Sequence, residues 1–323
     1  MSPEQITIAV TVFNRRQYLK QSIGSVLAQT APARILVMED CGPDPGLQEY
    51  VCREFGPRLE YFRSPRNRGI FGNWNAAIER CRTPWLSILH DDDFLAPEFV
   101  AAMMELARQA PDCGLYFGRT QTVNENGDPI PGGVTPLLNV PWRRAELAET
   151  LEGPPFPFPG QLFRVDDAKA LGGFRETSLF TGDWEMWSKL IARYGGAETD
   201  TLVAYNRTHF GPERGCTQIT LNGTRRPLVF VQQKRVLRLM REAGAPVRFS
   251  REKFLASTPM SVSELVQFGF GFAPRVLRYN VGLLLRSPPP SVPYAAFRAL
   301  TRLLGVRFVR IVSVLLRTLR RGP

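Results

Sequence analysis

The amino-acid sequence predicts an α/β fold, in which a doubly wound, mostly parallel, Rossmann-like sheet is followed by a basic helical C-terminal region. Three observations lead to this prediction. Apolar runs of strand length alternate with segments of helical spacing over the first 110 residues, the connections between them are short, and the pattern turns helical and basic from about residue 225. The 323 residues are 44% apolar and 22% charged. Such a chain can bury a sizeable core, which argues against a disordered, collagen-like or small disulfide-rich protein.

The first strand–helix units are predicted from hydrophobic spacing. The run ITIAVTVF at residues 6–13 is apolar and β-branched, as expected for a buried strand, and Tyr18, Leu19 and Ile23 then recur at helical spacing. The same alternation repeats three times, and right-handed crossovers would bring the strands into one parallel sheet. The expected strands are 6–13, 33–40, 59–64 and 85–93, and the expected helices are 15–29, 47–55, 73–81 and 97–110.

The middle of the chain is less regular. Residues 127–160 are rich in proline and glycine, which indicates an ordered substrate loop or a lid. Further elements surround this segment, and we divide the chain into a first domain at residues 1–224 and a basic helical region at residues 225–323. The expected strands are 114–123 and 201–209, and the expected helices are 166–171 and 184–195.

The charge of the chain is unevenly distributed. Lysine and arginine outnumber aspartate and glutamate by 41 to 30, which gives a formal net charge of +11. No acidic residue follows Glu264, and the last 53 residues hold ten arginines, so the excess belongs to the C-terminal region. In residues 295–321 several arginines share one helical face and apolar side chains cover the rest, which is typical of a helix lying in a membrane interface. A helical hairpin docked on the first domain is the alternative.

Nucleic acid is the other phosphate-rich partner that a basic tail could bind. The tail has few lysines and no asparagine or glutamine after Asn280, and its phenylalanines and tyrosines stand among apolar residues in the sequence. Groups that stack on bases or read them are therefore scarce, and we expect an anionic membrane surface rather than a nucleic acid as the partner.

The cysteines and the N-terminus favour a cytoplasmic protein. The five cysteines are scattered singly, which predicts neither a zinc cage nor a disulfide framework. The N-terminal segment MSPEQITIAV lacks the basic and long apolar regions of a signal peptide, and no run reaches the length of a spanning helix. We expect a cytoplasmic protein, peripheral on the inner face of the plasma membrane.

Acidic residues follow two of the predicted strands. Asp91, Asp92 and Asp93 end the fourth strand, where carboxylates on rigid backbone suit a hard divalent cation that bridges a diphosphate. Glu39 and Asp40 end the second strand, where a carboxylate can bind the ribose or base of a nucleoside. The alternative is that these residues cap helices or are solvated. No G-x-G-x-x-G follows the first strand, which argues against a dinucleotide-dependent dehydrogenase.

A further carboxylate, Asp183, precedes a predicted helix and has Trp184 and Trp187 beside it. A carboxylate among aromatic side chains is suited to take a proton from a hydroxyl nucleophile, although an N-cap aspartate with core tryptophans is the alternative. His90 and His209 are the two histidines of the chain. Each could be structural, but His90 directly precedes the acidic run.

Several of these segments together resemble the motifs of a known family. The segment VTVFNRRQYLKQSIGSVLAQT resembles the opening of family 2 glycosyltransferases, and ILVMEDCGPD resembles their second strand and acidic turn. The segment NRGIFGNWNAAIERCRTPWLSILHDDDFLAP is similar to the N-x-G and N-x-A helix that leads to the D-x-D strand, and LGGFRE followed by GDWEMW is similar to the family's G-G-F and catalytic-acid segments. The resemblance covers about residues 5–210 in order.

The resemblance implies a GT-A fold for residues 1–224, a nucleotide-diphospho-sugar donor, Mg or Mn, and inversion at the anomeric carbon. It places the general base on Asp183 and the best single metal ligand on Asp92. One departure matters, because His90 stands where many members have the first Asp of D-x-D. The remaining assignments are Asp93 and His209 for the metal, and Thr11, Phe13, Asn14, Arg16, Asp40, Asn67, Gly69, Asn75 and Asp91 for the donor.

The resulting hypothesis is an inverting, metal-dependent hexosyltransferase that transfers a sugar to a saccharide or lipid-linked acceptor hydroxyl in the synthesis of cell-surface polysaccharide or glycolipid. Asp183 would deprotonate the acceptor, and a metal on Asp92 with nearby arginines would stabilise the leaving nucleotide diphosphate. A Rossmann-like nucleotidyltransferase is an alternative, although it gives no reason for Asp183 or the G-G-F segment. A nucleic-acid-binding protein that uses the basic tail is another.

Overall fold

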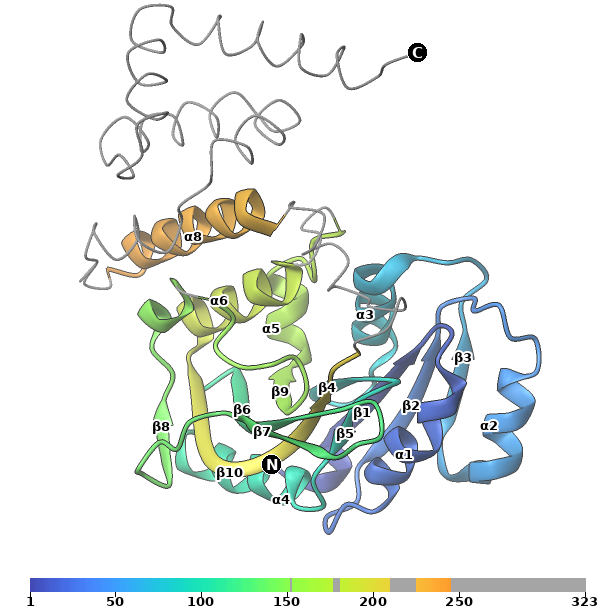
Figure 1. Cartoon of the computed structure of the whole chain (residues 1–323). Helices are drawn as coiled ribbons and strands as arrows, with labels where there is room; N and C mark the ends of the chain where they lie inside the picture. Colours follow the sequence, from blue (N-terminus) through green and yellow to red (C-terminus); the bar gives the residue numbers. More distant parts are fainter. Residues whose placement is uncertain (152, 177–180, 210–224, 245–323) are drawn as a thin grey trace, which may run out of the picture. The chain divides into compact units, whose positions relative to one another are not determined.

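The computed structural model describes residues 1–151, 153–176, 181–209 and 225–244 (Figure 1). The chain divides into two compact units, one formed by Met1–Arg214 with Arg235–Val247 and the other by Gly215–Lys234 with Arg248–Pro323. The described ten-stranded sheet belongs to the first unit.

The N-terminal half of the sheet confirms the predicted alternation of strands and helices. Its four strands lie in the order β3-β2-β1-β4, and all three pairings are parallel. Short 3-10 helices precede β1 at Pro3–Gln5 and β3 at Gly56–Arg58. The strands are β1 (Ile6–Val12), β2 (Arg34–Glu39), β3 (Glu60–Arg63) and β4 (Trp85–His90), and the helices are α1 (Arg16–Leu27), α2 (Leu47–Phe55), α3 (Gly69–Arg80) and α4 (Phe99–Gln109).

The second half of the sheet is mixed. The strand β9 (Gln161–Arg164) lies between β4 and β6 (Leu115–Val123) and is antiparallel to both, whereas β6 and β10 (Gly196–Arg207) are parallel. Two short strands, β5 (Phe94–Leu95) and β8 (Trp142–Arg144), pair antiparallel with β10. A third antiparallel strand, β7, pairs with β6 and spans Pro129–Val134. The sequence did not predict β5, β7, β8 and β9, and the expected strand at 85–93 divides into β4, a turn and β5.

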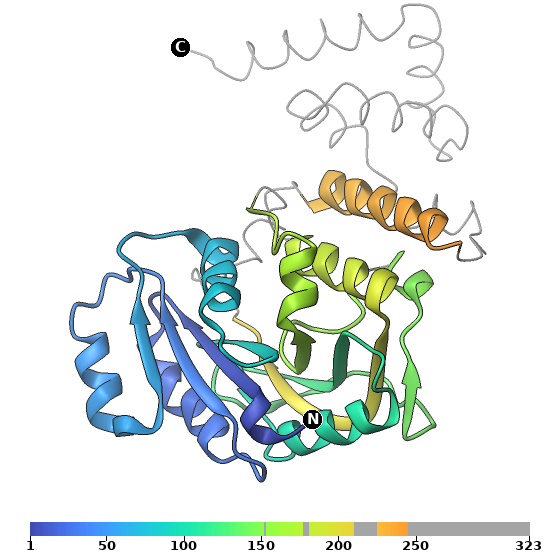
Figure 2. The ribbon, with the colours of Figure 1, turned by 180° about the vertical axis from the view of Figure 1, so that it is seen from behind.

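Helices cover both faces of the sheet (Figures 1 and 2). One face carries α1, α2 and α4, whose residues Leu19, Val51 and Phe99 join β1 in one apolar cluster. The other face carries α3, α5 (Val165–Ala170) and α6 (Gly182–Tyr194), where α3 contacts β1, β2 and β4. All seven residues of β1 are buried, as expected for a parallel strand with both faces covered. This packing holds the carboxyl ends of β1, β2 and β4 at one edge of the sheet, where ligands bind in such folds.

Two further parts of the chain were predicted from the sequence. The proline- and glycine-rich segment contains β7, β8 and a 3-10 helix, Leu147–Leu151, and its predicted role as a substrate loop or lid stays a prediction. Helix α8 (Arg225–Glu242) has the helical character that was predicted from residue 225. The predicted membrane-interface helix lies outside the described residues. Within the described ranges, no helix is long and apolar enough to cross a bilayer.

Candidate active site

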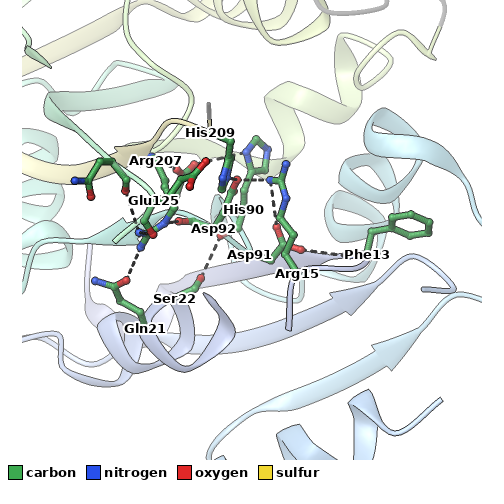
Figure 3. Close-up of polar contacts among 12 residues, drawn as sticks. Phe13, Arg15, Gln21, Ser22, His90, Asp91, Asp92, Glu125, Arg207 and His209 are labelled. Atoms are coloured by element: carbon green, nitrogen blue, oxygen red, sulfur yellow. Dashed lines mark hydrogen bonds and ion pairs between the residues drawn. The ribbon is translucent and has the colours of Figure 1, made fainter. Parts of the chain in front are cut away.

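The acidic run that follows β4 forms the centre of the candidate site (Figure 3). The chain turns at this point, with the amide of Asp93 donating to the carbonyl of His90 at 3.3 Å, and all three aspartates are buried. Each carboxylate has a different partner. Asp91 accepts from the amide of Phe13 at 3.3 Å, and Asp93 accepts from the amide of Arg207 at 2.8 Å. The turn therefore ties β4 to the end of β1 and to the end of β10.

Asp92 is bound by two basic side chains at one oxygen. Its Oδ2 contacts Nη1 of Arg15 and lies 2.7 Å from Nε2 of His209 (Figure 3). Burial alone would raise the pKa of Asp92, but the hydrogen bond from His209 and the charge of Arg15 outweigh it, so that the pKa lies below its ordinary value. Asp92 is therefore the carboxylate of the run that stays ionised most readily.

The two flanking carboxylates behave in the opposite way. Burial and the charge of Asp92 raise the pKa of Asp91 to about 7, against the opposing charge of Arg15. Burial and the charge of Asp92 also raise the pKa of Asp93 well above its ordinary value. Adjacent carboxylates repel one another when ionised, and a cation held between them would remove that repulsion.

His90 supplies a nitrogen donor beside these oxygens. Its ring stacks on Phe158, with the centroids 4.1 Å apart, and on Trp74 at 5.4 Å. Burial lowers the pKa of His90 to about 4, so that the imidazole is neutral at physiological pH. Its Nε2 is buried and makes no hydrogen bond among the described residues. A neutral ring nitrogen is a metal ligand.

The residues present fit a divalent cation. His90, Asp92 and Asp93 each offer a ligand atom, and these atoms lie within 4.8 Å of one another. Carboxylate oxygens together with one imidazole nitrogen form a donor set that suits Mn²⁺. Mg²⁺ prefers oxygen ligands and would use mainly the carboxylates. Of the predicted metal ligands, the structure brings Asp92 and Asp93 together and places His209 on Asp92, but the assignment of each as a ligand stays a prediction.

Arg207 fixes the far side of the turn. Its Nε donates to the carbonyl of Asp92 at 2.7 Å, its Nη1 donates to the carbonyl of Glu125 at 2.7 Å, and its Nη2 bonds Gln21. The guanidinium also lies over the ring of Tyr18, 4.6 Å from the centroid. Arg207 is buried and is fully engaged by these groups, so its role is to hold the aspartate turn in place.

The end of β2 forms the predicted nucleoside side of the site. Asp40 is buried and accepts from the amide of Arg68 at 2.7 Å, while the ring of Phe13 is 40% exposed. Burial raises the pKa of Asp40 even though the backbone amides of Arg68 and Gly69 bind it. Asn67 accepts from the amide of Gly69 at 2.8 Å, and Gly69 begins α3 at a φ of +72°. Asp40, Asn67 and Gly69 thus belong to one connected turn.

Glu39 holds this turn through hydrogen bonds from the protein interior. It is fully buried, contacts Tyr61 and Arg63, and accepts from the amide of Gly42 at 3.1 Å. Arg63 also donates to the carbonyl of Gly42 at 3.0 Å. A Cβ at Gly42 would lie 1.9 Å from the carbonyl oxygen of Phe13, so this close approach requires glycine. Glu39 was one of two candidate carboxylates for the nucleoside, with a cap at the strand end as the alternative, and in the structure its buried carboxylate bonds groups of the turn itself.

The other predicted donor residues differ in their surroundings. Thr11 is buried and donates to the carbonyl of Leu89 at 3.3 Å. Asn14 is exposed, and Arg16 pairs with Asp44 at 3.1 Å on the surface. Asn75 is committed elsewhere, because its side-chain amide makes two bonds, of 2.7 and 2.8 Å, to the backbone of Phe174. Their roles in donor binding stay predictions.

Asp183 lies in the first turn of α6 and accepts from the amide of Trp184 at 2.7 Å. Burial raises its pKa to about 6, although this amide bond opposes the shift. Glu185, two residues on, is buried and pairs with Arg175 and Lys189 at 3.0 and 2.7 Å. A carboxylate whose pKa is near neutrality can take up a proton and release it again at physiological pH.

Sequence reasoning missed Arg15, Arg207 and the inward role of Glu39. Arg15 is separated from Asp92 by 77 positions and Arg207 is separated from it by 115. Arg15 lies between Asn14 and Arg16 in the motif after β1, and both of these neighbours were predicted to bind the donor. A search for cations next to strand ends would have found Arg15.

A family model described as Glycosyl transferase family 2 matches residues 7–172 of this chain. An uncharacterized glycosyltransferase of Rickettsia conorii is 25% identical over 223 residues, which is 67% of this chain and 35% of that protein. Chondroitin synthase of Escherichia coli is 24% identical over 211 residues, which is 64% of this chain and 29% of that protein. The chain thus spans about a third of the length of these relatives.

Solved structures share the fold. The crystal structure of S. aureus TarS 1–349 in complex with UDP-GlcNAc superposes with a TM-score of 0.59 at 15% identity, covering 88% of each chain. A mannosyltransferase from Pyrobaculum calidifontis, PcManGT, in complex with GDP-Man and Mn²⁺, superposes with a TM-score of 0.55 at 14% identity, covering 100% of this chain and 90% of that one. At these identities the likeness establishes the fold.

Proposed function

The chain belongs to glycosyltransferase family 2 and has the GT-A fold, and we propose that it transfers a sugar from a nucleotide-diphospho-sugar to an acceptor hydroxyl, with inversion and with a divalent metal ion. One observation carries this proposal. The buried turn of Asp91, Asp92 and Asp93 lies at the same sheet edge as Phe13 and Asp40, and a hydrogen bond joins Phe13 to Asp91. A cation site and a nucleoside site in contact are what a nucleotide-diphosphate donor requires.

The nucleoside would bind at the ends of β1 and β2. The exposed ring of Phe13 offers an apolar face for a base or ribose, and Asp40 offers carboxylate oxygens as hydrogen-bond acceptors. The rigid turn that Glu39 and Gly42 form holds Asp40 in place. These residues would bind and orient the nucleoside part of the donor.

The metal would be held by Asp92 and Asp93, with His90 and His209 as the neighbouring nitrogen donors. When bound, a divalent cation neutralises the charge that develops on the leaving diphosphate. Asp92, which ionises most readily, supplies the first carboxylate. Arg207 and the amide of Phe13 hold the turn so that the carboxylates are positioned before the donor arrives.

Asp183 would be the general base. Its pKa of about 6 leaves most molecules ionised at pH 7 and makes the carboxylate a better proton acceptor than an ordinary aspartate. It would take the proton from the acceptor hydroxyl as that oxygen attacks the anomeric carbon. A single displacement of this kind needs one base and inverts the configuration, in contrast to the two-carboxylate retaining glycosidases.

The cellular setting is part of the same proposal. The chondroitin synthase of Escherichia coli among the relatives supports a role in polysaccharide synthesis, with a saccharide or lipid-linked acceptor. The ten arginines beyond residue 270 support attachment to the inner face of the plasma membrane. Binding to anionic vesicles and to duplex DNA at moderate salt tests that attachment, and preference for DNA would overturn it.

The decisive experiment uses a panel of nucleotide sugars. Each is added to the full chain with and without Mn²⁺, and the melting temperature is recorded. We expect one nucleotide class to raise the melting temperature, and to do so more strongly with Mn²⁺. Transfer to an acceptor is then followed by NMR of the anomeric proton, which distinguishes inversion from retention. Stabilisation by no nucleotide sugar, or retention of configuration, would overturn the proposal.

A further inference from the structure

Arg15 is a basic residue whose side chain contacts the acidic turn of the candidate site. It lies in the loop between β1 and α1, and its side chain reaches the turn after β4 (Figure 3). Its Nη1 contacts Oδ2 of Asp92 and lies 4.0 Å from Oδ1 of Asp91. The side chain of Arg15 is 20% exposed. Arg15 therefore pairs with Asp92, which the proposed metal would also use.

A guanidinium and a divalent cation compete for such a position. Both are attracted by the negative charge of Asp92, and each repels the other at close range. Other contacts also hold the turn, because His209 bonds the same oxygen of Asp92 at 2.7 Å and Arg207 fixes the backbone of the turn. Arg15 can leave Asp92 without loss of the turn.

We propose that Arg15 is an exchangeable counter-ion: it neutralises Asp92 while the metal is absent, and it binds the diphosphate of the donor once the metal has taken its place. This inference rests on the proposed function and adds a residue role to it. A guanidinium is always protonated and binds phosphate through two parallel N–H groups, which makes it suited to both partners.

The position of Arg15 favours the diphosphate as its second partner. Two residues before it, Phe13 offers its exposed ring at the nucleoside side, and Asp92 marks the proposed metal. The diphosphate of the donor must lie between the nucleoside and the metal, beyond the carboxyl ends of the strands. Arg15 is on the loop that joins these two positions.

Other arginines close to the site are committed to different partners. Arg16 pairs with Asp44 at 3.1 Å and lies over the ring of Tyr50, with 4.3 Å to the centroid. Arg207 is buried and bonds three carbonyl groups in addition to Gln21. Arg15 contacts the carboxylates of Asp92 and Asp91, which would also attract a divalent cation.

The test measures metal and nucleotide binding separately in the full chain. The variants are Arg15→Gln, Arg15→Lys and, as a control that removes one charge from the exposed surface of α1, Lys20→Gln. Binding of Mn²⁺ alone is measured at pH 8 by calorimetry and by quenching of tryptophan fluorescence, because Trp74 stacks on His90. Binding of UDP and of GDP is then measured at saturating Mn²⁺.

The two affinities should move in opposite directions. We expect Arg15→Gln to bind Mn²⁺ at least about tenfold more tightly, because the competing charge is gone, and to bind the nucleoside diphosphate at least about tenfold more weakly. Arg15→Lys should keep the metal affinity close to that of the unmodified protein, while losing nucleotide affinity because a lysine cannot make two parallel bonds. Lys20→Gln should change neither affinity more than about twofold, since it lies on the exposed surface.

Two results would overturn the inference, and a third concerns the proposed function. If Arg15→Gln leaves Mn²⁺ affinity unchanged, Arg15 does not compete with the metal. If both affinities fall together in Arg15→Gln and in Arg15→Lys, Arg15 has a structural role only. Failure of the unmodified protein to bind Mn²⁺ and either nucleotide would instead contradict the proposed function itself.

Discussion

The pKa of Asp183 leads to a quantitative prediction about the pH dependence of transfer. Burial raises this pKa from its ordinary value of 3.8 to about 6, so a general base at this position is lost at unusually mild acidity. The base acts when ionised, and the ionised fraction falls from about nine tenths at pH 7 to about one tenth at pH 5. We therefore expect kcat to fall about tenfold over this interval, whereas an ordinary aspartate would keep nearly full activity.

The assay measures nucleotide release at saturating donor, acceptor and Mn²⁺ between pH 4.5 and 8.5. Asp183→Asn removes the base, and kcat should fall by a factor of about 100 to 10,000 and lose its acidic limb. The matched control is Asp166→Asn on the exposed surface of α5, which should keep both the rate and the limb. An unmodified enzyme whose activity holds to pH 4.5, or an active Asp183→Asn variant, would refute the assignment of the base.

The same pKa shift has a consequence for stability that is independent of activity. Because the folded-state pKa of Asp183 is raised, the folded protein binds more protons than the unfolded chain, and stability decreases as pH rises from about 4 to about 6. Asp183→Asn removes this cost. The variant should gain up to about 3 kcal/mol in free energy of unfolding at pH 8 and little at pH 4. Equal gains at both pH values in urea unfolding would contradict the shift.

Three further variants test other parts of the site. Asp92→Asn should weaken Mn²⁺ binding and lower transfer about 100-fold or more, measured by calorimetry and nucleotide release, because it removes the carboxylate that ionises most readily. Glu39→Gln should cost about 2 kcal/mol in urea unfolding and weaken nucleotide binding, because it uncouples the buried carboxylate from Arg63 and the turn of Asp40. Asn75→Ala should cost about 2 kcal/mol of unfolding free energy through loss of its two bonds to Phe174, and unchanged stability would show that these bonds contribute nothing.

The first half of the fold could be predicted because its signals are local. The seven residues of β1 are all buried, and a continuous β-branched run reports that environment directly. The four-residue strand β9 and the two-residue strand β5 carry no comparable pattern, since they are ordered by pairing with β4, β6 and β10. Strand β7 lies in a segment rich in proline and glycine, where composition indicates a loop.

The candidate site divides in the same way. Asp40 and Asp91–Asp93 could be found from the sequence because each follows a strand that is visible by itself. The roles of Arg15, Arg207 and the inward-facing Glu39 could not be predicted, because they depend on partners that only the fold brings near. Arg15, Arg63 and Arg207 are bound to carboxylates and a carbonyl at the ends of β2 and β4. The net charge of the sequence therefore does not predict how charged side chains pair in the site.

His90 shows how one departure from the family pattern fits its surroundings. An aspartate at this position would place a fourth carboxylate beside Asp92, whose charge already raises the pKa values of Asp91 and Asp93. The imidazole stacks on Phe158 and, at a longer distance, on Trp74, and burial keeps it neutral, with a pKa of about 4. It therefore offers a ligand atom without adding a negative charge. A neutral histidine at this position therefore leaves the charge of the acidic turn unchanged, whereas an aspartate would increase it.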